Sequence, residues 1–194
     1  MIITTVMPQI FKIFTGPMKS GKSTHLLQYI SKYKYSGQEL IYIFPERDNR
    51  FIQGPSRTGI PLFGIPKYPL KLLDFNPNSV CKNIEKYNTI IIDEMHLFDS
   101  ELLFKVIDKL IKDKKNIIGA CLNADYNQAT FSILSMIFPH LTSIVNLSAF
   151  CDYCKKPAIY TIKTGGDKSK LIEIGDSIYN VCCGDCLRKS KKEV

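Results

Sequence analysis

A short stretch near the start of the chain has the residue types and spacing of a phosphate-binding loop. Residues 16–23 fit the pattern G-x-x-x-x-G-K-[ST] between a β-rich run and a helical pattern. Gly16 and Gly21 let the backbone curl so that successive N–H groups point at phosphate oxygens, and the following helix adds its positive end. Lys22 is expected to reach the β- and γ-phosphates, and Ser23 to bind Mg²⁺. The predicted nucleotide-binding residues of this loop are Gly16, Pro17, Met18, Lys19, Ser20, Gly21, Lys22 and Ser23.

A second apolar run, residues 88–92, ends in two carboxylates. Asp93 is predicted to hold Mg²⁺ through water, opposite Ser23. Glu94 then lies beside the γ-phosphate, where a carboxylate can take a proton from an incoming hydroxyl or water, so Glu94 is the predicted catalytic base. The alternative is that the pair merely ends a strand and caps the next segment of the chain. His96 could assist at the site, but a hydrogen-bonded structural histidine is the preferred interpretation, and His25 and His140 receive no role.

Five of the seven cysteines lie in the last quarter of the chain. Cys151 and Cys154 form one C-x-x-C pair, and Cys183 and Cys186 form a second one after 28 intervening residues. Two such pairs predict a structural Zn²⁺ held by four thiolates. Cys182 is an alternative ligand, but its distance from Cys186 breaks the two-residue spacing. Disulfides are a second alternative, against which the odd cysteine count argues; the isolated Cys81 and Cys121 are expected to be inert buried thiols.

The elements that must position these residues form a β-loop-α-β unit. It consists of a strand over residues 10–15, a helix over 22–35 and a strand over 40–44. Residues 45–79 are rich in Pro, Gly and Asn, and we expect them to form a long loop. Further elements are predicted at residues 88–92 (strand), 101–113 (helix, N-capped by Asp99), 116–122 and 143–147 (strands), and 158–164 and 170–174 (paired strands).

The predicted fold class is α/β, a P-loop (RecA-like) parallel sheet flanked by helices with a small C-terminal zinc-binding β lobe. The expected domains are residues 1–149 (nucleotide-binding), 150–188 (zinc-binding lobe) and 189–194 (flexible basic tail). The chain has 45% hydrophobic residues among 194, enough for a sizeable core. No apolar run approaches the roughly 20 residues of a membrane span, and the N-terminus lacks the pattern of a secretory signal. We therefore expect a soluble cytoplasmic protein without a membrane partner.

The net charge of +8 favours a polyanionic partner or a phosphorylated ligand. Lysines scattered over solvated helix faces give the same total, and this is the preferred interpretation. The charge alone thus does not identify a nucleic-acid-binding protein.

Three features together resemble the type II thymidine kinase family: residues 16–23, the Asp93-Glu94 pair followed by Phe98, and the late four-cysteine lobe. Tyr179, four residues before Cys183, adds to this resemblance, which runs from about residue 10 to 188. The resemblance implies a P-loop α/β domain, a zinc-held lobe with a lasso-like loop, and transfer of the γ-phosphate of ATP to the 5′-hydroxyl of thymidine. It also implies ATP, Mg²⁺ and structural Zn²⁺ as cofactors, and a homotetramer that needs no nucleic acid.

The same resemblance implies roles for further residues. Asp48, Asn49 and Arg50 stand where the family has Asp-x-Arg near the phosphates, and Tyr126 stands where it usually has a Phe against the thymine ring. The lasso segment, whose backbone reads the base edge in family members, corresponds to Leu171, Ile172, Glu173, Ile174 and Gly175, together with Tyr179. An unpaired buried polar edge costs about 1–3 kcal/mol, which explains how such a loop discriminates between bases.

The chain departs from the family pattern at several positions. Met95 stands where a small residue is common and is expected to narrow the site; Leu97 replaces an aromatic residue, and Gln128 an arginine. Residues 54–59 lack the usual His-Asp, and the lasso is one residue shorter than in common relatives. These departures bear on substrate breadth and rate and leave the reaction class unchanged.

Two other functions compete with this interpretation. The string from Asp93 to His96 fits the D-E-x-H motif of helicases, so a nucleic-acid-dependent ATPase is one alternative, although about 150 residues before the zinc lobe are too few for two P-loop-type domains. A zinc-ribbon binding module with a degenerate nucleotide site is the other. The second alternative is disfavoured because the nucleotide site is intact, with Lys22, Ser23, Asp93 and Glu94 all present.

Overall fold

The centre of the protein is a six-stranded parallel sheet, seen in a computed structural model that describes residues 9–46, 64–167, 169–171, 173 and 177–190. The strand order is β3-β2-β4-β5-β1-β6, and all five pairings are parallel. Aliphatic runs such as that of β4 are buried on both faces, as parallel strands between two helix layers must be. The strands are β1 (Phe11–Gly16), β2 (Leu40–Pro45), β3 (Lys67–Leu70), β4 (Thr89–Ile92), β5 (Asn116–Leu122) and β6 (Ser143–Asn146).

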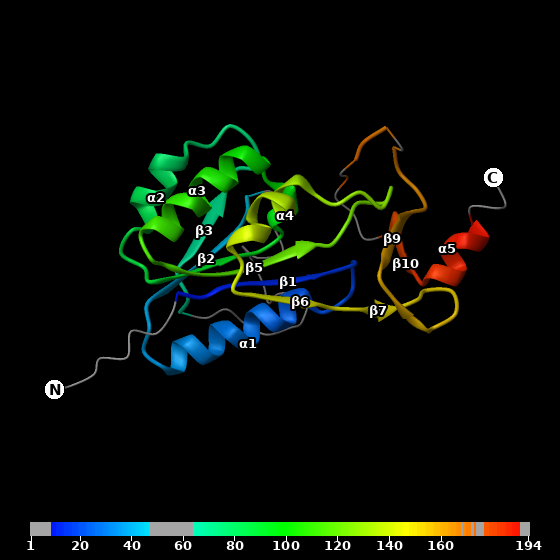
Figure 1. Ribbon diagram of the computed structural model, residues 1–194, viewed down its shortest axis with the longest axis horizontal. Coiled ribbons are helices and arrows are strands. Elements are labelled where there is room, and N and C mark those ends of the chain that lie inside the picture. Colours follow the sequence, from blue (N-terminus) through cyan, green and yellow to red (C-terminus); the bar gives the residue numbers. More distant parts are fainter. Residues whose placement is uncertain (1–8, 47–63, 168, 172, 174–176, 191–194) are drawn as a thin grey trace.

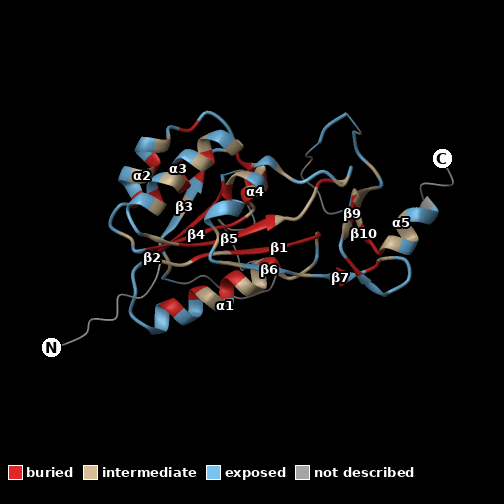
Figure 2. Ribbon diagram, viewed as in Figure 1, coloured by how far each residue is buried: buried red, intermediate tan, exposed pale blue. Residues whose placement is uncertain are grey.

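Helices cover both faces of the sheet (Figure 1). Helix α1 (Lys22–Tyr35) packs Leu26, Leu27 and Ile30 on one face. The other face is covered by α2 (Pro77–Ile84), α3 (Ser100–Lys112) and α4 (Ser132–Ile137). The short 3₁₀ turns η2 (Met95–Leu97) and η3 (Phe138–His140) complete this layer. The sheet therefore lies between two apolar cores, the buried band in Figure 2.

A smaller lobe lies beyond the carboxyl ends of the parallel strands (Figure 1). It contains two antiparallel pairs, β7 (Ala149–Phe150) with β8 (Pro157–Ala158) and β9 (Tyr160–Lys163) with β10 (Tyr179–Cys182), followed by α5 (Gly184–Ser190). Its small core is built from Ala149, Cys151, Ala158, Val181, Cys182 and Cys183, and Met18 of the glycine-rich loop packs against this core. The lobe is thus in contact with the end of the sheet where ligands bind in open α/β folds.

The prediction of one long loop over residues 45–79 is wrong for its second half. Strand β3 occupies 67–70, and α2 begins at Pro77. The prolines and asparagines that suggested a loop serve as boundary residues: Pro69 lies in an edge strand, where a missing N–H is tolerated. Asn76 caps α2, since its Oδ1 accepts hydrogen bonds from the N–H groups of Asn78 (2.9 Å) and Ser79 (3.2 Å).

The predicted pairing of residues 158–164 with 170–174 is also wrong. Strand β9 pairs with β10, with Lys163 opposite Tyr179 and Thr161 opposite Val181. The reason is the cysteine spacing: β10 must run back along β9 to deliver Cys183 next to Cys151. The other predicted elements agree with the structure to within a residue or two, and α1 begins and ends where predicted.

Two further predictions concern the C-terminal tail and membrane-spanning helices. Helix α5 extends to Ser190, so it includes Lys189, which we expected in the flexible tail. In the described ranges, none of the helices has the length and apolar character needed to cross a bilayer.

Candidate functional site

The glycine-rich loop connects the end of β1 to the start of α1, as its predicted role requires. Gly16 has φ +149°, and a Cβ on it would lie 2.5 Å from the carbonyl oxygen of Leu147 and 2.8 Å from Ser20 Oγ. Gly21 has φ +82° immediately before α1. A side chain is excluded at Gly16 by space and strained at Gly21 by its left-handed backbone, so the loop needs glycine at both ends.

Lys22 folds over this loop. Its Nζ donates hydrogen bonds to the carbonyl oxygens of Pro17 (2.7 Å) and Gly16 (3.2 Å), and the residue is 8% exposed. Ser20 Oγ is buried and has no hydrogen-bond partner among the described residues, so a bound phosphate oxygen would satisfy it. The loop, its lysine and this hydroxyl therefore fit a phosphate chain.

Asp93 lies at the end of β4 with its carboxylate fully enclosed. Its Oδ2 accepts hydrogen bonds from Tyr42 Oη (2.7 Å) and Ser23 Oγ (3.4 Å). Burial, followed by the nearby charge of Glu94, raises the pKa of Asp93 to about 7. Such a carboxylate is fully ionised at neutral pH only beside a cation, and a hydroxyl with a carboxylate is the protein donor set that Mg²⁺ takes in P-loop sites. Ser23 and Asp93 thus fit a magnesium ion.

Glu94 turns away from the strand at this point. Its backbone has φ +49°, and its N–H donates to Asp93 Oδ1 at 2.8 Å. Its side chain is 17% exposed. Residues held in the left-handed conformation carry a backbone cost that tends to occur at functional sites. The structure places Glu94 next to the Mg²⁺-type site formed by Ser23 and Asp93.

His96 lies beside Glu94, and the sequence favours a structural, hydrogen-bonded role for it. Its Nδ1 accepts a hydrogen bond from the N–H of Leu122 (3.3 Å), and its Nε2 lies 3.7 Å from Glu94 Oε2. Burial lowers the pKa of His96 to about 4. The ring is therefore neutral at physiological pH, with its proton on Nε2 facing Glu94. His96 is hydrogen-bonded, as predicted, and also borders the carboxylate.

This geometry predicts different effects on turnover for two substitutions of His96. In His96→Gln the side-chain amide can reach the position of Nε2 and donate toward Glu94, whereas in His96→Asn only the acceptor for Leu122 remains. We expect turnover within about twofold of the unaltered chain for Gln, and a loss of about three- to tenfold for Asn, because the contact of Nε2 with the Glu94 carboxylate is long, at 3.7 Å, and contributes about 1 kcal/mol. Steady-state rates check this. Because His96 stays uncharged, the pH–rate profile of His96→Gln should also match that of the unaltered chain between about pH 5 and 8; a shifted acid limb would contradict this assignment.

Met95 does not narrow the site as expected from the sequence. Its side chain is fully buried in the core between the sheet and α3. It lies over Gly119 of β5, where an added Cβ would collide with Met95 Sδ and lie 2.7 Å from Ile13 Cδ1. The bulk of Met95 is thus accommodated by the missing side chain at Gly119.

Tyr126 projects from a turn that follows β5. Asp125 Oδ1 accepts the N–H groups of Asn127 (2.8 Å) and Ala129 (2.9 Å), which fixes this turn. Gln128 Nε2 donates to the carbonyl oxygens of Tyr126 (3.1 Å) and Thr161 (3.4 Å). The tyrosine is therefore held against β9 of the smaller lobe.

Of the predicted lasso residues, Leu171, Glu173 and Tyr179 lie in the described part of the chain. Tyr179 Oη accepts a hydrogen bond from the N–H of Glu173 at 3.1 Å, and Leu171 is exposed. Both Tyr126 and Tyr179 lie beside Lys163, so the structure brings these predicted residues together. The predicted residues Asp48, Asn49, Arg50, Ile172, Ile174 and Gly175 lie outside the described residues.

The four predicted metal ligands meet in the smaller lobe. The Sγ atoms of Cys151, Cys154, Cys183 and Cys186 all lie within 4.8 Å of one another. In a tetrahedral zinc site with Zn–S near 2.3 Å the sulfurs are about 3.8 Å apart, and Cys154 and Cys183 are 3.5 Å apart. Although burial opposes the thiolate, backbone N–H groups lower the pKa of Cys151 to about 6. These cysteines can hold a metal ion such as zinc, whereas Cys182 is outside the cluster.

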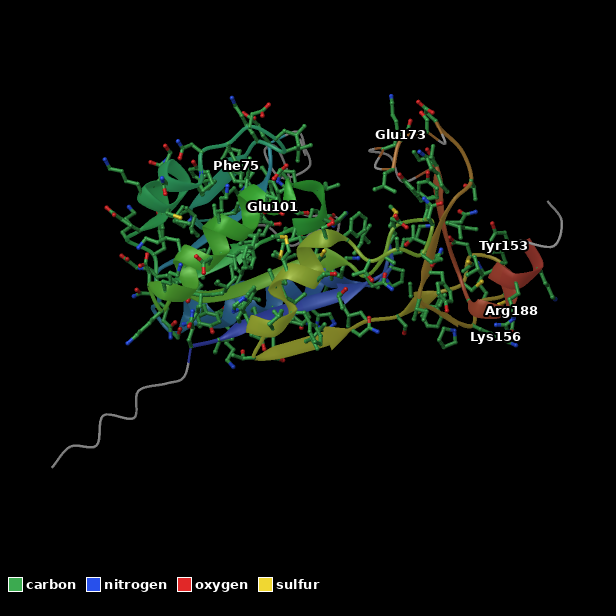
Figure 3. All side chains as sticks on the ribbon, turned by 45° about the horizontal axis from the view of Figure 1, so that its top comes forward. Phe75, Glu101, Tyr153, Lys156, Glu173 and Arg188 are labelled. Carbon is green, nitrogen blue, oxygen red and sulfur yellow. The ribbon has the colours of Figure 1, made fainter. Side chains whose placement is uncertain are left out.

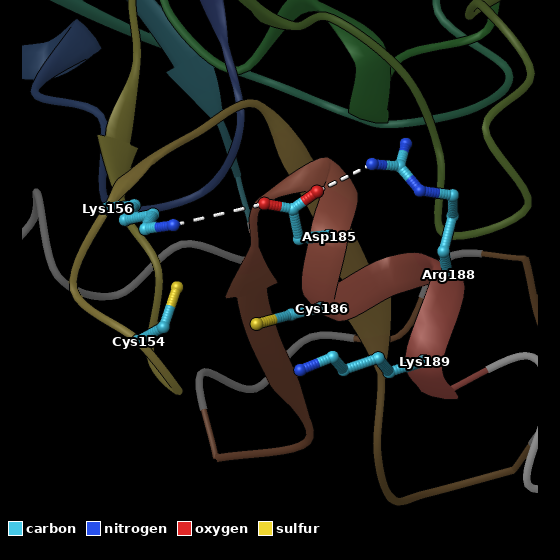
Figure 4. Close-up of a pocket in the computed structure, with 6 residues that line it drawn as sticks. All are labelled: Cys154, Lys156, Asp185, Cys186, Arg188 and Lys189. Carbon is cyan, nitrogen blue, oxygen red and sulfur yellow. Dashed lines mark hydrogen bonds and ion pairs between the residues drawn. The ribbon is translucent and has the colours of Figure 1, made fainter.

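An open pocket of about 380 Å³ borders the cysteine cluster (Figure 4). Asp185 pairs in it with Arg188 (2.6 Å) and Lys156 (4.0 Å). The pocket is lined by Cys154, Lys156, Asp185, Cys186, Arg188 and Lys189. Figure 3 shows Lys156 and Arg188 at the end of the lobe away from the sheet. Three cationic side chains and one carboxylate thus line the pocket beside two of the four cysteines.

Two contacts that no sequence pattern indicates hold the glycine-rich loop against this lobe. The N–H of Met18 donates to Thr161 Oγ1 (3.1 Å), and Lys19 Nζ pairs with Asp152 Oδ2 (3.0 Å). Asp152 Oδ2 also accepts the N–H of Val181 (2.8 Å). Asp152 lies inside the first cysteine pair, but nothing in the spacing marks a partner more than a hundred residues away.

A parallel sheet with a glycine-rich loop between β1 and α1, and an aspartate at the end of β4, defines a P-loop nucleotide-binding protein. A sequence model described as thymidine kinase matches residues 9–187, almost the whole chain. The chain belongs to the thymidine kinase family. It is accordingly a kinase, that is, a phosphotransferase.

Individual relatives agree with this family. The chain is 34% identical to the thymidine kinase of Amsacta moorei entomopoxvirus over 92% of this chain and 98% of the relative. It is 32% identical to that of Choristoneura biennis entomopoxvirus, over 92% and 96%. The thymidine kinase of an African swine fever virus isolate (Warthog/Namibia) is 26% identical, over 97% and 94%.

Proposed function

We propose that this protein transfers the γ-phosphoryl group of ATP to the 5′-hydroxyl of thymidine, with deoxyuridine as a possible second acceptor, to supply precursors for DNA synthesis by salvage. The observation that carries the proposal is the arrangement at the glycine-rich loop of buried Lys22 and Asp93 with half-buried Ser23 and Glu94, in a chain of the thymidine kinase family. The turn that holds Tyr126 and the lobe beside it supply a candidate base-binding surface.

Each residue then has a defined task. Lys22 and the loop N–H groups bind the phosphates of ATP, with Asp48, Asn49 and Arg50 as further candidates. Ser23 and Asp93 would hold Mg²⁺, which would supply neutralisation of the phosphate charge. Glu94 accepts the proton of the 5′-hydroxyl as that oxygen forms its bond to the γ-phosphorus and the bond to the leaving ADP breaks. Positioning and electrostatic stabilisation provide most of the acceleration.

The remaining parts of the proposal concern the base, the metal and the assembly. Tyr126, Leu171, Ile172, Glu173, Ile174, Gly175 and Tyr179 are the proposed nucleoside-binding residues. A Zn²⁺ on Cys151, Cys154, Cys183 and Cys186 is proposed to be structural, because four thiolates leave no open position for catalysis. We further propose a cytoplasmic homotetramer, which light scattering on the purified protein would test.

The test is a coupled ADP-release assay with ATP and Mg²⁺ across a panel of nucleosides, with single-stranded DNA in a parallel well. We expect release that depends on thymidine, with thymidine monophosphate as the product. Release driven by DNA and indifferent to nucleosides would overturn the proposal. In that case Glu94 would activate water, as in a nucleic-acid-dependent ATPase.

A further inference from the structure

One lysine at the end of β9 is buried inside the smaller lobe. The side chain of Lys163 is 1% exposed. Lysine is almost never fully buried unless it is paired, because removing an ammonium from water is costly. The phosphate chemistry proposed above gives this charge no task, so its burial needs another explanation.

The ion pair and the hydrogen bonds of the Lys163 ammonium all go to one stretch of chain between residues 167 and 173. Its Nζ lies 2.9 Å from Glu173 Oε2 and donates to the carbonyl oxygens of Asp167 (2.5 Å) and Lys170 (3.0 Å). A lysine has three donors, and these three acceptors match them. Lys163 therefore ties the end of β9 to three points on the segment that leads toward β10.

Two aromatic rings complete the surroundings of this charge. Nζ lies 5.5 Å from the ring centroid of Tyr126 and 5.9 Å from that of Tyr179. A cation within about 6 Å of a ring face is attracted to it. One lysine thus contacts the turn after β5, the start of β10 and the segment between the strands.

Glu173, labelled at the top of the smaller lobe in Figure 3, is also fixed by several contacts. Its Oε2 also accepts the N–H of Asp167 (2.9 Å), and its own N–H donates to Tyr179 Oη (3.1 Å). Gly166 has φ +73°, and a Cβ there would collide with the Glu173 carboxylate. The backbone is thus shaped to let this carboxylate approach Lys163.

We propose that Lys163 is the positioning residue that, through its ion pair with Glu173 and its contacts with Tyr126 and Tyr179, holds the base-binding side of the lobe in place and so sets the affinity for the nucleoside. This inference rests on the proposed function, and Lys163 acts through these neighbours without touching the base. Although burial opposes its charge, Glu173 raises the pKa of Lys163, and the hydrogen bond from Lys163 lowers that of Glu173. Both groups are therefore ionised at neutral pH.

Steady-state kinetics of four variants test the proposal. Lys163→Met leaves the Glu173 carboxylate unpaired, so we expect the KM for thymidine to rise about tenfold or more, while kcat and the KM for ATP change by less than about threefold. Glu173→Gln should also raise the KM for thymidine. Lys163→Arg keeps the positive charge, so its KM for thymidine should stay close to that of the unaltered protein. Lys170→Met is the matched control. The Lys170 side chain is exposed and makes a long ion pair with Asp167 Oδ2 (3.8 Å), so its loss is expected to leave the KM for thymidine unchanged.

Hydrogen exchange of the free protein provides a readout that needs no substrate. In Lys163→Met we expect faster amide exchange in peptides covering residues 164–178. Exchange of the peptide that contains the glycine-rich loop, and the metal content, should not change. If Lys163→Met fails to fold, Glu173→Gln takes its place in this measurement. A raised KM with unchanged exchange would overturn the proposal, because Lys163 would then contact the base directly. Unchanged KM and unchanged exchange would overturn it as well.

The two readouts also separate this proposal from the function on which it rests. If the unaltered protein does not phosphorylate thymidine, the proposed function fails. Faster exchange in Lys163→Met would then still establish Lys163 as the residue that orders this part of the lobe. In the double variant Lys163→Met/Glu173→Gln, the effect on exchange should be smaller than the sum of the two single effects, since both substitutions remove one ion pair.

Discussion

Glu94→Gln is expected to reduce turnover by about 10²- to 10⁴-fold, the usual contribution of a positioned general base, while ATP still binds. The amide keeps the size of the carboxylate and cannot accept the hydroxyl proton. The hydrogen bonds of Lys22 Nζ to the loop carbonyl groups do not involve Glu94, so the substitution leaves the conformation of the proposed phosphate-binding loop in place. Coupled ADP release measures the rate, and titration calorimetry with ATP measures the binding.

Glu101→Gln is the control for this prediction. Glu101 is an exposed carboxylate in the first turn of α3, labelled in Figure 3, and its substitution is expected to leave the rate unchanged. If Glu94→Gln kept a near-normal rate, Glu94 would not be the base. If it lost ATP binding together with turnover, its main role would lie in the nucleotide site.

Cys154→Ser is expected to release the metal and with it the order of the smaller lobe. A structural zinc site contributes about 10–16 kcal/mol of apparent binding free energy, which is large beside the small core of this lobe. Because β9 and β10 carry Thr161 and Lys163, we expect thymidine phosphorylation to fall by at least about tenfold. Elemental analysis, hydrogen exchange of β9 and β10 and the rate assay measure the three effects.

Two serine variants control for the loss of a thiol. Cys81→Ser changes a half-buried cysteine that packs against the large core, and the metal should be retained. Cys182→Ser changes the cysteine next to the cluster, and it should also retain the metal because its sulfur is not among the four that converge. Loss of metal in Cys182→Ser, or normal metal content in Cys154→Ser, would contradict the assignment of ligands.

Most strands of the parallel sheet could be predicted because local sequence patterns identify them. Aliphatic runs such as that of β4, and the helical period that begins at Lys22, depend only on neighbouring residues. Strand β3 and the β9–β10 pairing could not be predicted in this way. The edge position of β3 and the return of β10 along β9 are decided by the rest of the sheet and by the cysteine cluster, which lie far away in the sequence.

The candidate site divides along the same line. The glycines, Lys22 and Ser23 have a fixed spacing, and the Asp93-Glu94 pair directly follows an aliphatic run, so local patterns predict all of them as site residues. Tyr42, which donates to Asp93, lies within a buried apolar strand and reads as a core residue. Lys163 reads as one more surface lysine among many, because its partners Tyr126 and Glu173 are brought to it only by the fold.

The contact between Met95 and Gly119 makes these two positions dependent on one another. A Cβ at position 119 would collide with the thioether of Met95 and lie 2.7 Å from Ile13 Cδ1. A side chain at 119 is therefore excluded while Met95 and Ile13 keep their present places, and shortening Met95 alone leaves the contact with Ile13. Anyone redesigning this core thus has to treat positions 13, 95 and 119 as one unit and change them together.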